Sequence, residues 1–584
     1  MDGELLEQKP ERVADYFVVV GLDSDVVALQ DEPFTFCDER YRGGCASPEA
    51  AESAEAGGET YDAALARVLN TRYRAEVIDR YPQEDHPDSA LPPQVAMFAL
   101  PEGLTVKESC PLPTFCIVVF TSNEGKRLYA SVLTFHEEVP TAVLHRMLFG
   151  NEKESNLLAG GVPSTTERRA AKTLWLPKCI CSLSHWLFFE LHREFLKQLY
   201  RVSLTASRVP IERLICNLIY EVPLPPRGRV RVQYSIADQT CELARAPPNQ
   251  LPFAHVPLDM LFELLDRNNV LELFTCVLLE YKILLYSKHP AVLSMVTEAL
   301  LSLIFPFRWH HVYIPVLPLQ LLEFVNAPTP FIMGVHPGPL QQRKSGDAID
   351  RILGEWSPED VVIVNLDENN VRFPPQEQPP PLPQKLRKKL LDRLVPLVGD
   401  YDAAAARERV VAMDLAFAMA PTPAESDSAT RKKKSLSADV TGQVQYCFFR
   451  IFLSLMRNYR EYLIIPTAED PDPRELFRKH AFLQSTPKEA RRFLASFVET
   501  SMLDSFIERR VYAAGNDHDH VLFDESMDAK ANRSALRLHK RPTPFLDDKR
   551  QALARTHVAL APNDEGLAPG THVALRIGER AWCV

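Results

Sequence analysis

Few side chains in this sequence stand at spacings that support chemistry, and each has a structural alternative. Cys179 and Cys181 in "PKCICSL" could ligate a metal ion, but no second pair follows at zinc-site spacing, so we expect buried packing. The run "DHDH", from Asp517 to His520, has ligand residue types in an unpatterned acidic segment. His310 and His311 are adjacent, so at most one of them faces a core. We therefore predict no metal site.

The sequence also lacks the common catalytic motifs. It contains no GxxxxGK[ST] loop to cradle a nucleotide phosphate and no GxSxG turn to present a nucleophilic serine. Glu280 ends a strongly apolar helix, where a carboxylate is costly to bury unless it is paired or hydrogen-bonded. We predict that Glu280 is a structural anchor. The sequence predicts no catalytic residue and no cofactor, and it favours a protein that works by binding.

Length and composition limit the class of protein. The chain has 584 residues, ordinary globular composition and a net charge of −11, so we expect several folded units and no nucleic-acid partner. Its 11 cysteines lie mostly in apolar runs, which indicates reduced thiols and a cytoplasmic location. The acidic N-terminus does not resemble a signal peptide, and Glu272, Glu280 and Lys282 interrupt the longest apolar region. We predict no transmembrane segment.

Residues 12–150 are predicted to form an antiparallel sheet with a covering helix. The strand-like runs begin at Asp15 and recur at 95–101, 114–122 and 127–138. A turn at Gly125 would join the last two runs, and "TAVLHRMLF" has the helical period needed to cover one face. We predict that the Ala/Gly/Glu-rich stretch up to about residue 70 is a loop insertion. Residues 151–173 are predicted to be a linker.

Residues 174–375 change to helices that alternate with buried strands, which predicts an α/β unit with a largely parallel sheet. The predicted strands lie in "KILLYS", "YIPVL", "PFIMGV" and "DVVIVNLD". The apolar segment Phe305–His336 carries five prolines, which cannot donate to a sheet ladder. We interpret this segment as a rigid wall. Its predicted structural anchors are Pro306, Pro315 and Gly334.

The rest of the chain is predicted to contain a linker at 376–441, an all-helical module at 442–512 and a weakly ordered tail at 513–584. The linker includes a proline-rich connector and the Ser/Lys-rich stretch "RKKKSLS", which we expect to be mobile. Ser435 and Ser437 in that stretch are phosphorylation candidates, because a phosphate beside four cations could dock or detach the loop.

Several motifs occur in the order found in DENN-domain proteins. "ADYFVVVGLD" and "FTSNEGKRLYASVLTFHEE" are similar to the upstream part of DENN domains, and "LFTCVLLEYKILLYS", "IFPFRWHHVYIPVLP", "NAPTPFIMGVH" and "VIVNLD" resemble the central part. "FLASFVETSMLDSFIERR" resembles the downstream helix with an E-T-x-M-F-x-x-F-I pattern, from which Leu503 and Asp504 depart. The resemblance covers about residues 12–512. "LPKCICSLS", "NLIYEVPLPPRGR" and "VLFDESMDAK" look like the branch that carries RUN and PLAT modules downstream, which we do not expect here.

The resemblance implies an N-terminal longin-like α/β module (uDENN), a central α/β module (cDENN) and a helical C-terminal part (dDENN). It also implies guanine nucleotide exchange on a Rab-family small GTPase, which requires no acid, base or nucleophile. Two alternatives stay open. One is a Rab effector or scaffold without exchange activity. The other is a GTPase-activating protein with an arginine finger from "SNEGKR" or "PPRGRVR".

Within the resembling segments we expect a composite surface for the GTPase, formed by the longin-like sheet and the proline-rich wall. The expected contact residues are Tyr16, Phe17, Trp309, Tyr313, Phe331 and Asp367. Any membrane association would be peripheral and through partners. The sequence leaves open which Rab is the substrate, which membrane is involved, and the oligomeric state.

Overall fold

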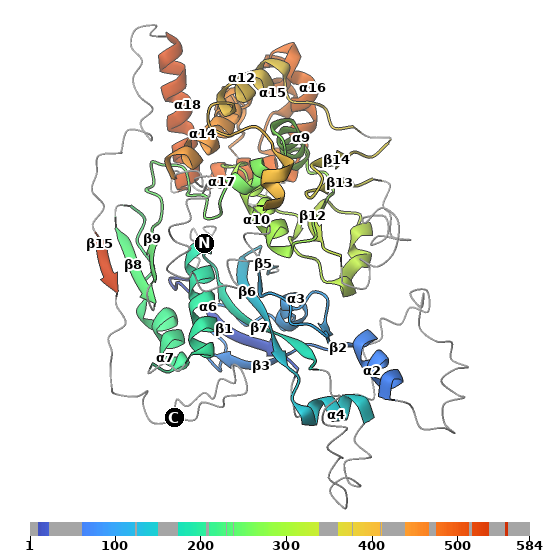
Figure 1. Cartoon of the computed structure of the whole chain (residues 1–584). Coiled ribbons are helices and arrows are strands. Elements are labelled where there is room, and N and C mark those ends of the chain that lie inside the picture. Colours follow the sequence, from blue (N-terminus) through green and yellow to red (C-terminus); the bar gives the residue numbers. More distant parts are fainter. Residues whose placement is uncertain are drawn as a thin grey trace, which may run out of the picture.

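The structure is a computed structural model. It describes residues 10–22, 61–122, 125–149, 173–205, 209–228, 230–236, 239–337, 360–375, 378–408, 410, 438–465, 475–512, 517–535 and 555–558. The phosphorylation candidates Ser435 and Ser437 lie outside these residues, as does the predicted linker up to residue 172. Figure 1 shows an N-terminal sheet in the lower half of the molecule, with the α/β module and the C-terminal helices above it. Among the described helices, none combines the length and the apolar character needed to span a membrane.

The N-terminal sheet has five strands in the order β3-β1-β7-β6-β5, and every neighbouring pair is antiparallel. The strands are β1 (Tyr16–Gly21), β3 (Glu76–Tyr81), β5 (Thr114–Thr121), β6 (Arg127–Glu138) and β7 (Trp175–Ser184). The central module was predicted to begin at residue 174, and in the structure β7 lies between β1 and β6 and completes the N-terminal sheet.

Both faces of the N-terminal sheet are covered. Helix α6 (Phe189–Leu204) lies on one face, where Phe195 meets Phe17 edge to face with ring centroids 6.4 Å apart. Helix α3 (Val95–Ala99) covers the other face through Val95 and Phe98, which join the core cluster of Tyr16. Residues 95–101 were predicted to be a strand. The structure corrects this, because a five-residue apolar run has no periodicity that separates a short buried helix from a strand.

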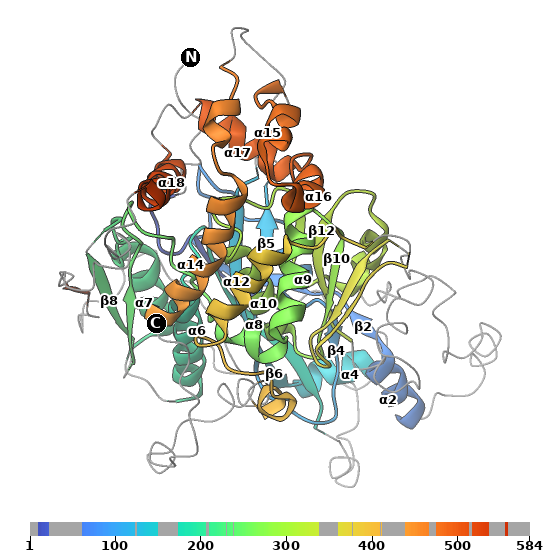
Figure 2. The same cartoon turned by 90° about the horizontal axis from the view of Figure 1, so that it is seen from above.

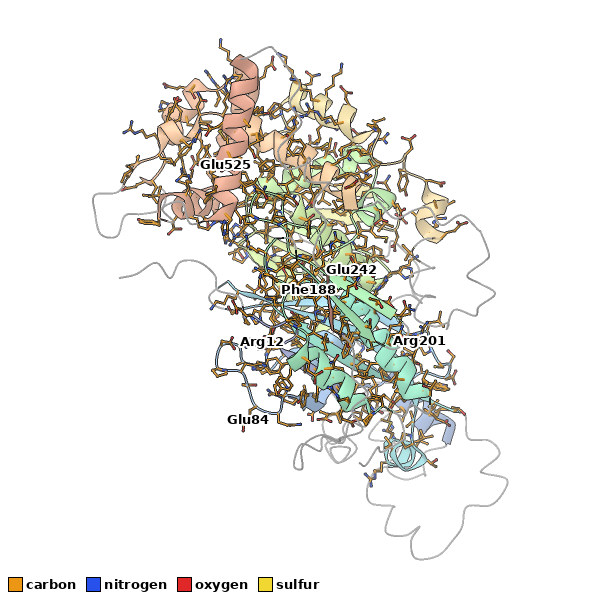
Figure 3. All side chains as sticks on the ribbon, turned by 90° about the vertical axis from the view of Figure 1, so that its left-hand side faces the viewer. Arg12, Glu84, Phe188, Arg201, Glu242 and Glu525 are labelled. Atoms are coloured by element: carbon orange, nitrogen blue, oxygen red, sulfur yellow. The ribbon has the colours of Figure 1, made fainter. Side chains whose placement is uncertain are left out.

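Smaller elements surround this sheet. Helices α2 (Tyr61–Asn70) and α4 (Thr141–Phe149) pack on each other, and β2 (Arg72–Tyr73) pairs with β4 (Leu104–Thr105). Helix α7 (Ile211–Cys216) continues directly into the π-helix η5 (Asn217–Glu221). The next elements are β8 (Arg231–Ile236) and β9 (Gln239–Leu243), which form an antiparallel hairpin. Strand β15 (Arg555–Val558) pairs in parallel with β8. Figure 3 shows Phe188, at the start of α6, between the lower and upper halves of the molecule.

The central sheet has the strand order β11-β12-β10-β13-β14. Its strands are β10 (Ile283–Tyr286), β11 (Val312–Ile314), β12 (Phe331–Val335), β13 (Val362–Asn365) and β14 (Asn370–Arg372). The first four are mutually parallel where they pair, and only β14 is antiparallel, which confirms the predicted α/β fold class. Helices α8 (Asp259–Leu264), α9 (Arg267–Leu278) and α10 (Pro290–Ser302) share the core of one face. The 3-10 helix η6 (Leu319–Asn326) covers the other.

The C-terminal part is helical. It contains α12 (Gln384–Leu394), α14 (Ala438–Leu455), the 3-10 helix η8 (Tyr459–Tyr462), α15 (Lys479–Ser485), α16 (Lys488–Phe497), α17 (Ser501–Tyr512) and α18 (His518–Ala535). Residues 518–535 were predicted to belong to a weakly ordered tail. The structure corrects this, because Phe523 and Met527 of α18 are buried in the core cluster that also holds Phe452 of α14. The same continuous cluster includes Phe17 of β1, so the halves share one core.

Candidate functional site

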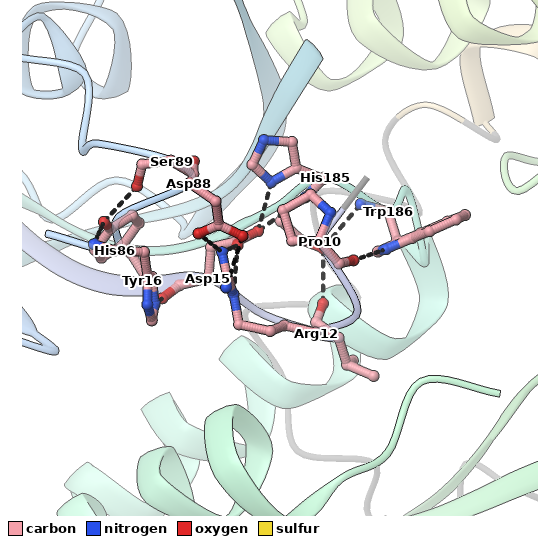
Figure 4. A network of polar contacts seen from close by, with 11 residues as sticks. Pro10, Arg12, Asp15, Tyr16, His86, Asp88, Ser89, His185 and Trp186 are labelled. Carbon is pink, nitrogen blue, oxygen red and sulfur yellow. Dashed lines mark hydrogen bonds and ion pairs between the residues drawn. The ribbon is translucent and has the colours of Figure 1, made fainter. Parts of the chain in front are cut away.

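A buried polar network fixes the segment that precedes β1 (Figure 4). The Asp15 carboxylate accepts from Arg12 Nη2 over 2.7 Å and from the His185 backbone N–H over 3.0 Å, and it lies 2.9 Å from His185 Nδ1. Burial alone would raise the pKa of Asp15, but hydrogen bonds and charge from His185 and Arg12 hold it below the ordinary value. Trp186 Nε1 donates to the Pro10 carbonyl over 2.8 Å. The network therefore ties residues 10–15 to the end of β7.

Tyr16 and Phe17 lie on opposite faces of β1, and both are buried. The Tyr16 hydroxyl donates to the Ser89 carbonyl and accepts from the His86 backbone N–H, each over 2.6 Å. Phe17 packs under α6. Because successive strand residues alternate between faces and each face has its own helix, neither side chain reaches a surface.

The predicted wall is a core structure around Trp309 and Tyr313. Trp309 is 4 % exposed, and its Nε1 donates to the Val312 carbonyl over 3.2 Å. Tyr313 is 3 % exposed, and its hydroxyl donates to Glu298 Oε1 over 2.7 Å and lies 3.1 Å from Thr297 Oγ1. Both partners of Tyr313 belong to α10. The wall is therefore bonded to the helix behind it.

The structure thus corrects five of the six expected contact residues. The buried residues are Tyr16, Phe17, Trp309, Tyr313 and Phe331. Their side chains support the surface and do not present one. Asp367 is half-buried at the carboxyl end of β13 and stays a candidate for contact.

Arg127, at the start of β6, joins the N-terminal sheet to the wall. Its Nη2 donates to the Trp309 carbonyl over 2.8 Å, and its guanidinium lies 4.8 Å from the ring centroid of Tyr313. Burial opposes the charged form, but Tyr129, Glu298 and Tyr313 together raise the pKa of Arg127 above its ordinary value. A second bond runs from the Ile117 N–H of β5 to Ser294 Oγ of α10 over 3.2 Å. Both bonds cross between the modules.

Two of the predicted anchors, Pro315 and Gly334, lie directly against each other. A Cβ atom at position 334 would stand 2.0 Å from the Pro315 carbonyl oxygen, a separation that no real side chain adopts. Leu317 N–H donates to the Gly334 carbonyl over 2.8 Å, so the chain crosses closely over β12 here. Glycine at 334 is required for this close approach. Pro306, the third anchor in the wall, accepts a hydrogen bond from Arg509 Nη2 over 3.3 Å.

Glu280 connects the end of α9 to the start of α17. Its N–H donates to Val277 and the next N–H, of Tyr281, donates to Cys276, the paired bonds of a Schellman cap. Glu280 holds the left-handed position of that cap with φ +55°, where glycine is usual. Its carboxylate accepts from Ser501 N over 2.9 Å and from Met502 N over 2.7 Å, and lies 3.1 Å from His311 Nε2. The hydrogen bonds that the Glu280 carboxylate accepts at the start of α17 offset the strain of its left-handed backbone conformation.

This geometry predicts an order of stabilities at position 280. Glu280→Ala removes the cap and keeps the left-handed strain, so we expect it to lose about 1–2 kcal/mol of unfolding free energy. Glu280→Gly removes the same cap but relieves roughly 1 kcal/mol of strain, so it should melt between Glu280→Ala and the unmodified protein. Thermal melts of the three proteins test this. If the alanine variant melts as high as the glycine variant, the strain argument is wrong.

The carboxyl edge of the central sheet gathers polar groups from both modules. Asp367 accepts from Ser287 Oγ over 2.8 Å and from the Lys288 N–H over 3.0 Å. On the same edge His336 Nε2 lies 3.0 Å from Glu102 Oε1, a residue of the N-terminal module. Burial raises the pKa of Glu102 and lowers that of His336 to about 4, which favours a neutral His336. Leu319 N–H donates to the Pro101 carbonyl over 2.9 Å beside this pair.

The residues considered for metal binding have structural roles. Cys179 and Cys181 are fully buried in β7 within the core cluster of Tyr16, and burial raises the pKa of the Cys181 thiol well above its ordinary value. The "DHDH" run begins α18, where the Asp517 carboxylate accepts from the Asp519 N–H and lies 3.1 Å from Arg509 Nη1. His311 faces Glu280, whereas His310 is exposed. No cluster of metal-ligand side chains occurs in the part of the chain that the structure describes.

Two exposed apolar residues of the wall were not predicted from the sequence. Val312, at the start of β11, is 39 % exposed, and Phe324, on the outer side of η6, is 45 % exposed. Leu319, Leu322 and Val325 anchor η6 to the sheet. Phe324 therefore lies on a helix that is packed firmly against the sheet. The sequence pattern alone does not distinguish this exposed residue from its buried neighbours.

Three domain-family models match the chain, in order along the sequence. The uDENN domain matches residues 75–135, the DENN (AEX-3) domain matches residues 175–369, and the dDENN domain matches residues 477–526. The first match ends in β6, and the second begins at the first residue of β7, in the same sheet. The third begins before α15 and ends within α18.

Proposed function

Because this chain is a DENN-domain protein with the tripartite uDENN, DENN and dDENN architecture, we propose that it is a guanine nucleotide exchange factor for a Rab-family small GTPase in vesicle trafficking. DENN domains generally act as Rab exchange modules. The observation that carries the proposal is the occurrence of all three segments in one chain. In this role the protein regulates the reaction of its partner and performs no covalent chemistry of its own.

An exchange factor must bind the nucleotide-free GTPase more tightly than the nucleotide-bound form. By thermodynamic reciprocity it then weakens nucleotide binding by the same factor, about tenfold for each 1.4 kcal/mol of differential contact. A surface that deforms on binding would lose part of this difference in affinity between the nucleotide-free and the nucleotide-bound GTPase. The Arg127 contact, the bonded Tyr313 and the close packing of Pro315 on Gly334 give the wall a fixed geometry, which supports the proposal.

We propose that the contact surface consists of exposed side chains of the wall together with Asp367 at the sheet edge. Phe324 and Val312 offer apolar side chains, and Asp367 offers a carboxylate at the sheet edge beside the exposed Lys288. Apolar and aromatic side chains held on rigid elements are the usual energetic centres of protein interfaces. The buried aromatic residues act behind them as support.

The arginine-finger alternative is weakened by the contacts of its candidate residues. Arg127 of "SNEGKR" is held by the Trp309 carbonyl and the Tyr313 ring. In "PPRGRVR", Arg231 pairs with Glu242 over 2.8 Å. A catalytic arginine must reach the transferred phosphoryl group, which the contacts of Arg127 oppose, whereas the exposed Arg227 keeps the second loop open as an alternative.

Release of a fluorescent GDP analogue from a panel of purified Rab proteins tests the proposal. We expect faster release from at least one Rab in the presence of the full chain. Accelerated GTP hydrolysis without accelerated GDP release would instead identify a GTPase-activating protein. Binding without either effect would identify an effector.

Phe324→Ala is the sharpest surface variant once a substrate Rab is known. We expect the exchange rate to fall by about tenfold or more, because an exposed aromatic anchor is lost, while the melting temperature stays unchanged. Leu204→Ala is the matched control, because Leu204 is 67 % exposed at the far end of α6. Equal exchange rates for both variants would remove Phe324 from the contact surface.

A further inference from the structure

Helices α12, α14 and α18 carry a cluster of basic side chains on one side of the molecule. Figure 2, the view from above, shows α14 between α12 and α18, and both neighbours contact it. The cluster, called the cationic face below, consists of Lys389 and Arg393 of α12, Arg450 of α14, Arg457 just past its end, and Lys530 of α18. Lys389 and Arg457 are exposed, and the other three are half-buried.

The spacing of these residues places them together. Arg450 and Ser454 lie one turn apart on α14, and Arg457 follows in the turn two residues after the last residue of the helix. Lys530 Nζ donates to Ser454 Oγ over 2.6 Å, which brings α18 onto this face between the two arginines. On α12, Lys389 and Arg393 are one turn apart.

No carboxylate of the described residues forms an ion pair with the cationic face. The acidic residues of α18 pair elsewhere: Asp519 with Arg308, Asp524 with Arg510 and Asp528 with Arg460. Asp392 of α12 and Glu525 of α18, the latter labelled in Figure 3, are both exposed. The carboxyl ends of α12 and α14 lie close to Arg393 and Arg457 in the sequence. Each helix end contributes only about half a negative charge. This concentration of positive charge stands out in a chain of net charge −11.

The titration of Lys530 reports the same crowding. Burial, together with the charges of Arg450, Arg393, Arg457 and Lys389, lowers the pKa of Lys530 to about 8. Arg393 likewise has a lowered pKa, from burial and from Arg450. A bound anion would relieve this repulsion.

We propose that the cationic face binds the phosphorylated headgroup of an anionic membrane lipid of the phosphoinositide class. Its cations are spread over three helices, which suits several phosphate groups better than one. Because clusters of arginine also recognise phosphorylated peptides, the test below includes a phosphopeptide as a competitor. Val395, which is 55 % exposed two residues after Arg393, adds an apolar side chain that could enter the interfacial region of a bilayer. The remaining negative charge of the protein would orient this face toward the membrane.

Cosedimentation of the full chain with phosphatidylcholine vesicles, with and without phosphatidylinositol phosphate, tests the proposal. We expect binding only to the phosphoinositide vesicles, weakened by salt and by a soluble inositol phosphate. The double variant Lys389→Gln/Arg457→Gln should bind roughly 30-fold more weakly, at about fivefold for each charge removed near a membrane surface. The control Lys488→Gln/Arg492→Gln removes the same charge from exposed positions on α16 and should bind like the unmodified protein.

Equal binding of the two double variants, or no binding of the unmodified protein to phosphoinositide vesicles, would overturn the proposal. So would a phosphoserine peptide that competes better than the soluble inositol phosphate, because it would identify a peptide site. Melting temperatures of both variants show that they are folded. Nucleotide exchange measured in solution without vesicles should be unchanged in both, which separates this proposal from the proposed exchange function.

Discussion

Gly334→Ala should destabilise the protein by about 3 kcal/mol or more, at or above the upper end of the usual range for overpacking. The added methyl group would lie 2.0 Å from the Pro315 carbonyl oxygen, 3.0 Å from its carbonyl carbon and 3.2 Å from Leu293 Cβ. The first two are backbone atoms, so a rotamer change cannot remove the clash. The chain between β11 and η6 would have to move away from β12 and from α10. Thermal and denaturant unfolding measure this effect.

A second glycine provides a control of opposite sign. Gly442 lies within α14, and a Cβ atom there would meet no other atom within 4 Å. Gly442→Ala should therefore stabilise the protein by about 0.5–1 kcal/mol, through the lower conformational entropy of alanine in the unfolded chain. If Gly334→Ala had the same melting temperature as Gly442→Ala, the close approach of Pro315 to Gly334 would have no energetic importance.

The sequence predicted elements whose signal is local. The buried strands "KILLYS" and "PFIMGV" were found because apolar β-rich runs bounded by breakers are typical of parallel strands. The position of β7 was not found, because its partners β1 and β6 are distant in sequence and no local pattern encodes the pairing. Helix α18 was missed because its polar sequence buries few large side chains, among them Phe523 and Met527.

Exposure was the hardest property to predict at the candidate site. Tyr16 and Phe17 alternate between the two faces of β1, and one of them would be exposed if either face were open to solvent. Helices α3 and α6 cover both faces. Trp309 and Phe324 are both aromatic residues of the proline-rich wall, yet Trp309 is buried and Phe324 is exposed. The difference depends on which elements pack behind each residue, and that information is not local.

The loss of Arg127 should be the most damaging change at the junction between the N-terminal sheet and the wall. Arg127→Met would remove the bond to the Trp309 carbonyl and the cation above Tyr313. It would also remove a positive charge near Glu298, which is only 7 % exposed. Because removal of one charge from a buried group leaves the remaining charge less well compensated, we expect a loss of about 3–5 kcal/mol. Arg74→Met is the control, since Arg74 is largely exposed and should change stability by less than about 0.5 kcal/mol.

A double-mutant cycle with Glu298→Gln separates the charge effect from the loss of packing. If the weaker charge compensation at Glu298 causes most of the loss, Arg127→Met/Glu298→Gln should be more stable than the sum of the single effects predicts, by about 1 kcal/mol or more. Simple additivity would show that Arg127 acts through packing and its bond to Trp309 alone. The cycle also bears on exchange. A variant that remains folded at the assay temperature but exchanges nucleotide more slowly would show that the junction held by Arg127 is needed for exchange.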